Sequence, residues 1–273
     1  MKKRKYFELA GCILGCAIIA ILVHALLPSP GGTMAVEEFD SLLVKTVGFP
    51  VVASLYFVIL YVHIVFALLY LGSHSSLDSK SIGIRCGIVF AALYMVGMQE
   101  VVVSAPFTSW GMDFVLYQFF MGLGDAIPAF ILCFVMGLFF IKSKGKERVN
   151  TAGSARKVAL IAAIVFAERM IGQATGIISS DINVYPMAVC LWTLLFGLVM
   201  GIAYVILEPA FKAQRKWFSI ILVIGLNWIW FNCFIGLIMA GLIGQMLLRG
   251  ILDVMALTFG VLIADKFWGG DLR

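Results

Sequence analysis

The chain has 273 residues, of which 62% are hydrophobic and only 13% are charged. An ordinary soluble domain carries about 25% charged residues, so this composition excludes a soluble globular protein. We therefore predict an all-α polytopic membrane protein, whose apolar surface is solvated by lipid. The net charge of +5 comes from short basic clusters beside apolar segments. Such clusters indicate contact with anionic lipid headgroups and not with nucleic acid.

Runs of about 20 apolar residues, the length that crosses a bilayer, recur along the chain. They predict about eight transmembrane helices in a single integral membrane domain that covers residues 1–273. The predicted spans are 6–27, 48–71, 83–104, 114–141, 157–178, 186–207, 217–240 and 242–266. Only a short glycine-containing turn separates the last two, so seven spans with a re-entrant segment remain an alternative.

Lysine and arginine are concentrated in alternate connections between the predicted spans. The basic segments are 2–5, 80–85, 142–157, 212–216 and 266–273, whereas the other connections hold Lys45 alone beside acidic residues. This asymmetry predicts that the basic connections are cytoplasmic, with both termini on that side. Two cytoplasmic termini require an even number of spans, which favours eight. The predicted location is the cell membrane.

The longest connection on the opposite side contains a predicted amphipathic segment, 33–47. Phe39, Leu42, Leu43 and Val47 recur there at helical spacing, with charged residues between them. This pattern predicts a short helix on the outer membrane surface. A cap packed over the helical bundle is the alternative.

The basic segment 142–156 divides the chain into two candidate halves, 1–145 and 146–273. A shift of 128 residues places Asp125 on Asp253 and Gln99 on Asn227. The third and fourth spans would then correspond to the seventh and eighth. Two halves of four helices would form a parallel repeat, which in transporters places the binding site between the halves.

Asp125 is the most informative residue, because it lies in the middle of the predicted span 114–141. A carboxylate at this depth costs roughly 2.5–3.5 kcal/mol and marks a functional site. Pro128 cannot donate a hydrogen bond to the carbonyl of Gly124. Together with Gly122, these residues predict a helix break beside the carboxylate, as in many transporters. The alternative is that the glycines only allow tight helix packing.

Five further ionisable residues fall within the predicted spans. They are Glu100, Glu168, Arg169, Arg249 and Asp253. With Asp125, four acids face two bases, which leaves a charge of −2 when all are ionised. A buried carboxylate without a partner takes up a proton or holds a cation, so the excess predicts proton coupling or cation binding. The alternative is that some carboxylates face a water-filled vestibule.

Helical spacing restricts which of these charges pair. Glu168 and Arg169 are neighbours and point about 100° apart, so Arg169 needs a partner on another helix. We expect that partner to be Asp125 or Glu100. Arg249 and Asp253 are four residues apart and can pair with each other, which would give that pair a structural role.

The seventh span adds polar side chains. Asn227 and Asn232 point about 140° apart, so they cannot both line one narrow site. At least one of them is expected to form hydrogen bonds between helices. Trp228 and Trp230 are placed to form the wall of a cavity. His24 and His63 are candidates for proton relays.

One motif resembles that of an enzyme family. Gly122-Leu-Gly-Asp125 resembles the Gly-x-Gly-Asp motif of the intramembrane aspartyl proteases, namely the presenilin, signal peptide peptidase and prepilin peptidase families, and Pro209-Ala210 resembles part of the Pro-Ala-Leu element of the first two. The resemblance implies that Asp125 shares a proton with a second aspartate. The preceding span offers Glu100 instead, and Asp253 follows Asp125, against the order of the family.

The expected function is a proton- or cation-coupled small-molecule transporter with a mid-membrane acidic site. The alternatives are an intramembrane aspartyl-type protease and an accessory subunit of a membrane complex. No catalytic residue, metal or cofactor is expected. Expected partners are the lipid bilayer and a small-molecule or cationic substrate, and assembly as a homo- or hetero-oligomer stays open. The candidate substrate or ion site comprises Asp125, Glu168, Arg169, Glu100, Asp253, Arg249 and Asn227.

Overall fold

The computed structural model describes residues 2–27, 39–103, 112–143, 145, 153–211 and 216–268, and this part of the chain contains helices and no strands. The predicted all-α fold class is confirmed. The helices are α1 (Lys2–Leu26), α2 (Leu42–Val47), α3 (Phe49–His74), α4 (Ser79–Met98), α5 (Glu100–Val103), α6 (Met112–Val135), α7 (Ser154–Ala174), α8 (Pro186–Leu207), α9 (Lys216–Ile220), α10 (Leu226–Ile238) and α11 (Ile243–Trp268). Two π-helical segments, Met136–Phe140 and Ile221–Gly225, follow α6 and α9.

Within the described ranges, seven helical segments are long and apolar enough to cross a membrane. The chain is therefore a multi-pass membrane protein, but by length and composition the count is seven instead of about eight. The exception is the predicted span 157–178. Its helix, α7, carries Lys157, Glu168 and Arg169 within one stretch of membrane-spanning length. Both Lys216–Ile238 and Ile243–Trp268 are long enough to cross, so neither is a short re-entrant piece.

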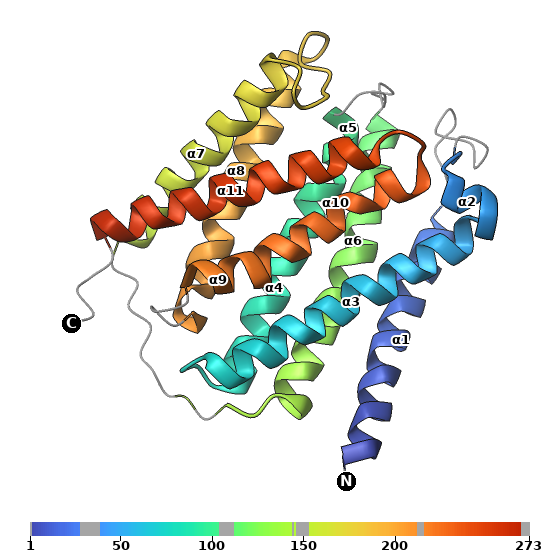
Figure 1. The fold of residues 1–273 in the computed structure, drawn as a ribbon, viewed down its shortest axis with the longest axis vertical. Helices are drawn as coiled ribbons and strands as arrows, with labels where there is room; N and C mark the ends of the chain where they lie inside the picture. Colours follow the sequence, from blue (N-terminus) through green and yellow to red (C-terminus); the bar gives the residue numbers. More distant parts are fainter. Residues whose placement is uncertain are drawn as a thin grey trace.

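α7 is nevertheless part of the bundle: it lies at the edge, antiparallel to α8 and in contact with α11 (Figure 1). At its start, Lys157 contacts Glu208 at the end of α8, with 2.5 Å between Nζ and Oε1. Beyond its other end, the backbone N–H of Asp181 donates to the carbonyl of Val103, at the end of α5. α7 thus extends between the same two ends of the bundle as its neighbours.

Small residues allow the closest helix contacts, as is common between membrane helices. A Cβ atom on Gly83 of α4 would lie 2.6 Å from the carbonyl oxygen of Cys133 in α6. A Cβ atom on Gly197 of α8 would lie 2.7 Å from the carbonyl oxygen of Ala162 in α7. Backbone therefore packs directly against backbone at both contacts.

The predicted helix break in α6 is wrong, because α6 continues without interruption from Met112 to Val135 with Pro128 inside it. A Cβ atom on Gly122 would lie 3.3 Å from the sulfur of Met95, and one on Gly124 would lie 3.0 Å from Cε1 of His24. The two glycines thus allow α4 and α1 to approach α6 closely. This is the packing role that stood as the alternative.

α2 is the described part of the predicted amphipathic segment; residues 33–38 lie outside the described ranges. Its N-cap Ser41 accepts a hydrogen bond from the backbone of Val44 and donates, through Oγ, to the carbonyl of Leu237 in α10 at 2.7 Å. Asp40 accepts a hydrogen bond from the backbone of Ala240 at 2.9 Å. These contacts tie α2 to the end of α10, as in the cap alternative. Most of the basic segment 142–156 lies outside the described residues.

We expect Gly83→Ala to destabilise the protein, because the added methyl group must displace the backbone of α6. Overpacking of this kind costs about 1–3 kcal/mol, which will lower the melting temperature of the purified protein in detergent. Gly15→Ala is the matched control, since nothing lies within 4 Å of the position that its Cβ would take. Equal melting temperatures for the two variants would contradict the close contact of α4 and α6.

Candidate functional site

A buried cluster of charged side chains surrounds Arg169 of α7, which has no exposed surface. Its Nε and Nη2 donate to the two carboxylate oxygens of Asp253 in α11, both at 2.6 Å. Its Nη1 donates to Oε1 of Glu100, the first residue of α5. The guanidinium also lies over the rings of Trp192 and Phe196 in α8, 5.5 and 5.0 Å from their centroids. Charge pairing and cation–π contacts together compensate the buried guanidinium.

Two further side chains complete the cluster. Arg249 of α11 contacts Oε1 of Glu100 through Nη1 at 3.0 Å and donates through Nη2 to the carbonyl of Ser179 at 3.1 Å. Trp228 of α10 donates through Nε1 to Oδ2 of Asp253 at 2.6 Å. Both oxygens of Asp253 are therefore occupied by donors.

Glu168 adds an acid to this cluster. Its two carboxylate oxygens are buried and make no hydrogen bond of good geometry. The charged groups that act on it are Asp253, Arg169 and Glu100. Three acids thus face two arginines in the cluster, so one carboxylate lacks a cationic counterpart.

Asp125 lies apart from the cluster and pairs with a histidine. Its Oδ1 is 3.4 Å from Nε2 of His24 in α1, and Asp125 is only 4% exposed. The other ring nitrogen, Nδ1 of His24, lies 2.7 Å from the carbonyl oxygen of Ala20. Because a carbonyl only accepts, Nδ1 carries the hydrogen there. Nε2 and the carboxylate then face each other, and a stable contact requires one proton between them.

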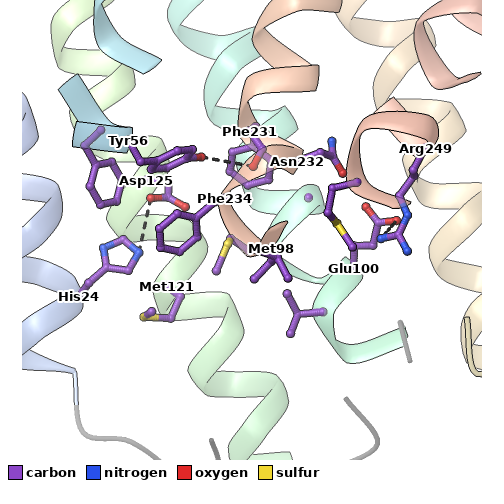
Figure 2. Close-up of a pocket in the computed structure, with 15 residues that line it drawn as sticks. His24, Tyr56, Met98, Glu100, Met121, Asp125, Phe231, Asn232, Phe234 and Arg249 are labelled. Carbon is purple, nitrogen blue, oxygen red and sulfur yellow. Dashed lines mark hydrogen bonds and ion pairs between the residues drawn. The ribbon is translucent and has the colours of Figure 1, made fainter. Parts of the chain in front are cut away.

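A cavity connects Asp125 with the charged cluster, as Figure 2 shows. Its volume is about 60 Å³, room for a few water molecules at roughly 10–15 Å³ each. Asp125 and His24 lie at one end, and Glu100 and Arg249 at the other. The wall between them is mainly aromatic and sulfur-containing, formed by Tyr56, Phe57, Met98, Met121, Phe231, Phe234 and Met246.

The discontinuity nearest to the cavity is between α4 and α5. α4 ends at Met98 and α5 begins at Glu100, with Gln99 between them. Both Met98 and Glu100 line the cavity. The carboxylate of Glu100 therefore lies where one helix ends and another begins, a position that the predicted break in α6 did not anticipate.

Asn227 lies in a separate chain of hydrogen bonds that joins three helices. The hydroxyl of Tyr94 in α4 donates to Oδ1 of Asn227 at 3.0 Å. Nδ2 of Asn227 lies 3.4 Å from Nδ1 of His63 in α3, whose Nε2 lies 3.0 Å from the carbonyl oxygen of Leu222 in the π-helical segment. Asn227 is absent from the cavity lining, whereas Asn232 is part of it.

The structure decides between the pairings that the sequence left open. Arg169 contacts Glu100, one of its two predicted partners, and not Asp125. The predicted pair of Arg249 and Asp253 does not form a direct contact; these residues bind Glu100 and Arg169, respectively. Glu100, Glu168, Arg169, Arg249 and Asp253 are thus brought together, with Asp125 across the cavity.

Sequence reasoning missed two contacts. The sequence predicts a general role in proton relay for His24, but not that it is the partner of Asp125. Trp228 was considered as a cavity wall, although its indole N–H binds Asp253. The presence of His24 within the first predicted span was the one available signal, since a histidine inside a membrane helix needs a polar partner.

Comparisons of this chain with protein-family models, curated proteins and solved structures find no match. The fold and composition define a multi-pass helical membrane protein. Its function must be inferred from the cavity and the charges around it.

We expect Arg169→Met to be strongly destabilising, because it leaves Asp253 and Glu100 buried without their main counter-ion. Breaking a buried ion pair in this way costs about 3–5 kcal/mol, measurable as a fall in the unfolding midpoint in detergent. The double variant Arg169→Met/Asp253→Leu should recover part of the loss, because it removes one of the unpaired charges. Arg4→Met is the control, since the Arg4–Glu8 pair is exposed and such pairs contribute little. Midpoints equal for Arg169→Met and Arg4→Met would contradict a central role for Arg169.

Proposed function

We propose that the protein is a proton- or cation-coupled transporter of small molecules, with its binding site in the cavity between Asp125 and Glu100. The observation that carries the proposal is a cavity with a buried carboxylate at either end. Its lining comes from α1, α3, α4, α5 and α6 in the first half of the chain and from α10 and α11 in the second. Binding sites of this kind lie where the halves of a transporter meet.

The charge balance supports coupling to a cation. Around the cavity and the adjoining cluster, the acids Asp125, Glu100, Glu168 and Asp253 face the bases Arg169 and Arg249. The sum is −2 when all six are ionised. With one proton on the His24–Asp125 pair, the sum becomes −1, so one negative charge is still to be compensated. In a medium of low dielectric constant, a proton or another bound cation compensates it.

A repeated arrangement supports two halves of four helices. In the first half, His24 of α1 contacts Asp125 of α6, and its ring lies 5.4 Å from that of Phe57 in α3. In the second half, Arg169 of α7 contacts Asp253 of α11 and lies over Phe196 of α8. Each half thus has a basic residue on its first helix, an aromatic ring on its second and an aspartate on its fourth.

We also propose that α7 crosses the membrane as an eighth span, with both termini in the cytoplasm of a cell-membrane protein. The position of α7 between the two ends of the bundle supports this (Figure 1). The charges of α7 are compatible with a membrane span, because the side chains of Arg169 and Lys157 are buried against protein. The concentration of lysine and arginine in alternate connections supports the orientation.

Fusions to alkaline phosphatase, which is active only outside the cytoplasm, will check this topology. We expect fusions after Gly145 and after Trp268 to be inactive and a fusion after Ser180 to be active. An inactive fusion after Ser180 would mean that α7 does not cross, and an active fusion after Trp268 would place the end of α11 outside.

The protease alternative has less support. An aspartyl dyad needs two carboxyl groups that share a proton and activate a water molecule. Both oxygens of Asp253 are bound by Arg169 and Trp228, and Asp125 contacts His24 instead of a carboxyl group. Pro209 and Ala210 lie at the end of α8 beside Glu208, whose carboxylate binds Lys157 and Lys216.

Transport is tested with the purified protein in liposomes that enclose a pH-sensitive dye. We expect at least one solute from a panel of amines, amino acids, sugars and carboxylates to change the internal pH. Asp125→Asn should abolish that response, because it removes the carboxylate that pairs with His24. Glu8→Gln is the control, since Glu8 is an exposed acid that contacts Arg4 outside the cavity.

A response that persists unchanged in Asp125→Asn would remove Asp125 from the coupling mechanism. No response to any solute, together with stable co-purification of another protein, would favour an accessory subunit. Cleavage of membrane peptides that an aspartyl transition-state analogue blocks would favour the protease.

A further inference from the structure

The wall of the cavity near Asp125 consists of aromatic rings that contact one another. The ring centroids of Tyr56 and Phe234 are 4.5 Å apart, and those of Tyr56 and Phe57 are 5.2 Å apart. Phe57 also lies beside His24, the partner of Asp125. Figure 2 shows the carboxylate of Asp125 between the rings of Tyr56 and Phe234. A carboxylate among ring faces attracts a cation twice, through its charge and through the ring quadrupoles.

The charges restrict the ligand to a single positive charge. Asp125 has no arginine or lysine partner among the described residues, and its one ionic contact, with His24, is 3.4 Å long. At the far end, Glu100 contacts both Arg169 and Arg249. A dication would therefore find one available carboxylate and, beyond it, two guanidinium groups. An anion would face Asp125.

The chemistry of the wall favours an organic cation over a metal ion. Hard metal cations bind six to eight oxygen ligands, or retain several waters. The middle of the cavity instead offers the sulfur atoms and rings of Met98, Met121 and Phe231. Among the described residues, no group of three or more histidine, cysteine, aspartate or glutamate side chains is placed to hold a metal ion.

We propose that this cavity binds a small, apolar organic monocation, with its ammonium group at Asp125 among Tyr56, Phe57 and Phe234. The apolar part of the ligand extends toward Met98 and Phe231. The acceptor for the ammonium group is the buried oxygen Oδ1 of Asp125, which accepts no hydrogen bond of good geometry. The ammonium group takes the place of the proton that Oδ1 shares with Nε2 of His24, 3.4 Å away, and this proton is released. This inference names the substrate class of the proposed transporter, and it rests on that function only for the transport step; binding can be measured without it.

The test uses the purified full-length protein in detergent and propylamine, which is protonated at neutral pH and whose four heavy atoms match a space for a few water molecules. We expect isothermal titration calorimetry to detect its binding and to detect none for propionate, which has a similar size and the opposite charge. Asp125→Asn should weaken binding roughly 10–150-fold. This range corresponds to the loss of a hydrogen bond to a charged group, which contributes about 1.5–3 kcal/mol.

Phe234→Leu should weaken binding about 2–30-fold, because a cation–π contact contributes about 0.5–2 kcal/mol. Phe259→Leu is its matched control and should bind as the unmodified protein does, since Phe259 is 58% exposed on the outer face of α11. This pair of variants keeps the test decisive even where Asp125→Asn fails to fold.

Three results would overturn the inference: no binding of propylamine, equal binding of propionate, or equal effects of Phe234→Leu and Phe259→Leu. The liposome assay separates this failure from that of the proposed function. Binding of the amine without any transport would support the cation site and contradict the proposed transporter. Coupled transport of another solute without amine binding would support the transporter and contradict the cation site.

Discussion

The burial of Arg169 is the constraint on which the arrangement of α5, α7, α8 and α11 depends. A guanidinium with no exposed surface is stable only when its charge and its five N–H donors are compensated. Asp253, Glu100 and the ring of Phe196 provide this compensation from α11, α5 and α8. Because these three elements converge on one group, α7 packs against α8 and α11 with Arg169 buried, despite the charges that this helix carries. Glu100, which binds Arg169, also lines the cavity. The geometry of the cavity therefore depends on the contacts of Arg169.

Much of the fold could be predicted from the sequence, because the length of an apolar run is a local property. The positions of α3, α6 and α8 follow from it directly. The number of helices that are apolar enough to cross a membrane differs from the prediction at α7, because that helix carries charged residues. Local composition does not reveal that these charges face other helices. The break in α6 was predicted from Pro128 and two glycines. The helix continues because a proline removes one hydrogen bond, a loss that a membrane helix tolerates, while the glycines are used for packing.

The pairing of charges could be predicted only in part. Helical phase excluded Glu168 as the partner of Arg169 and left Glu100 among the candidates, which the structure bears out. The four-residue spacing of Arg249 and Asp253 on one helix also predicted that these two residues would pair. The arginine instead contacts Glu100 on another helix, and no pattern within α11 contains that information. The partner of Asp125, His24, likewise depends on how α1 packs against Gly124, a tertiary contact.

On the proposed repeat, Asp125 and Asp253 are equivalent positions with different surroundings. Asp253 accepts three hydrogen bonds, each of 2.6 Å, from Arg169 and Trp228, so a ligand would have to displace strong charge-assisted bonds to reach it. Asp125 has one ionic contact of 3.4 Å, with the imidazole of His24. A carboxylate held by arginine stabilises the fold, whereas one held by histidine can exchange its partner. The same chemical group therefore fixes the bundle in one half and is available to a cation in the other.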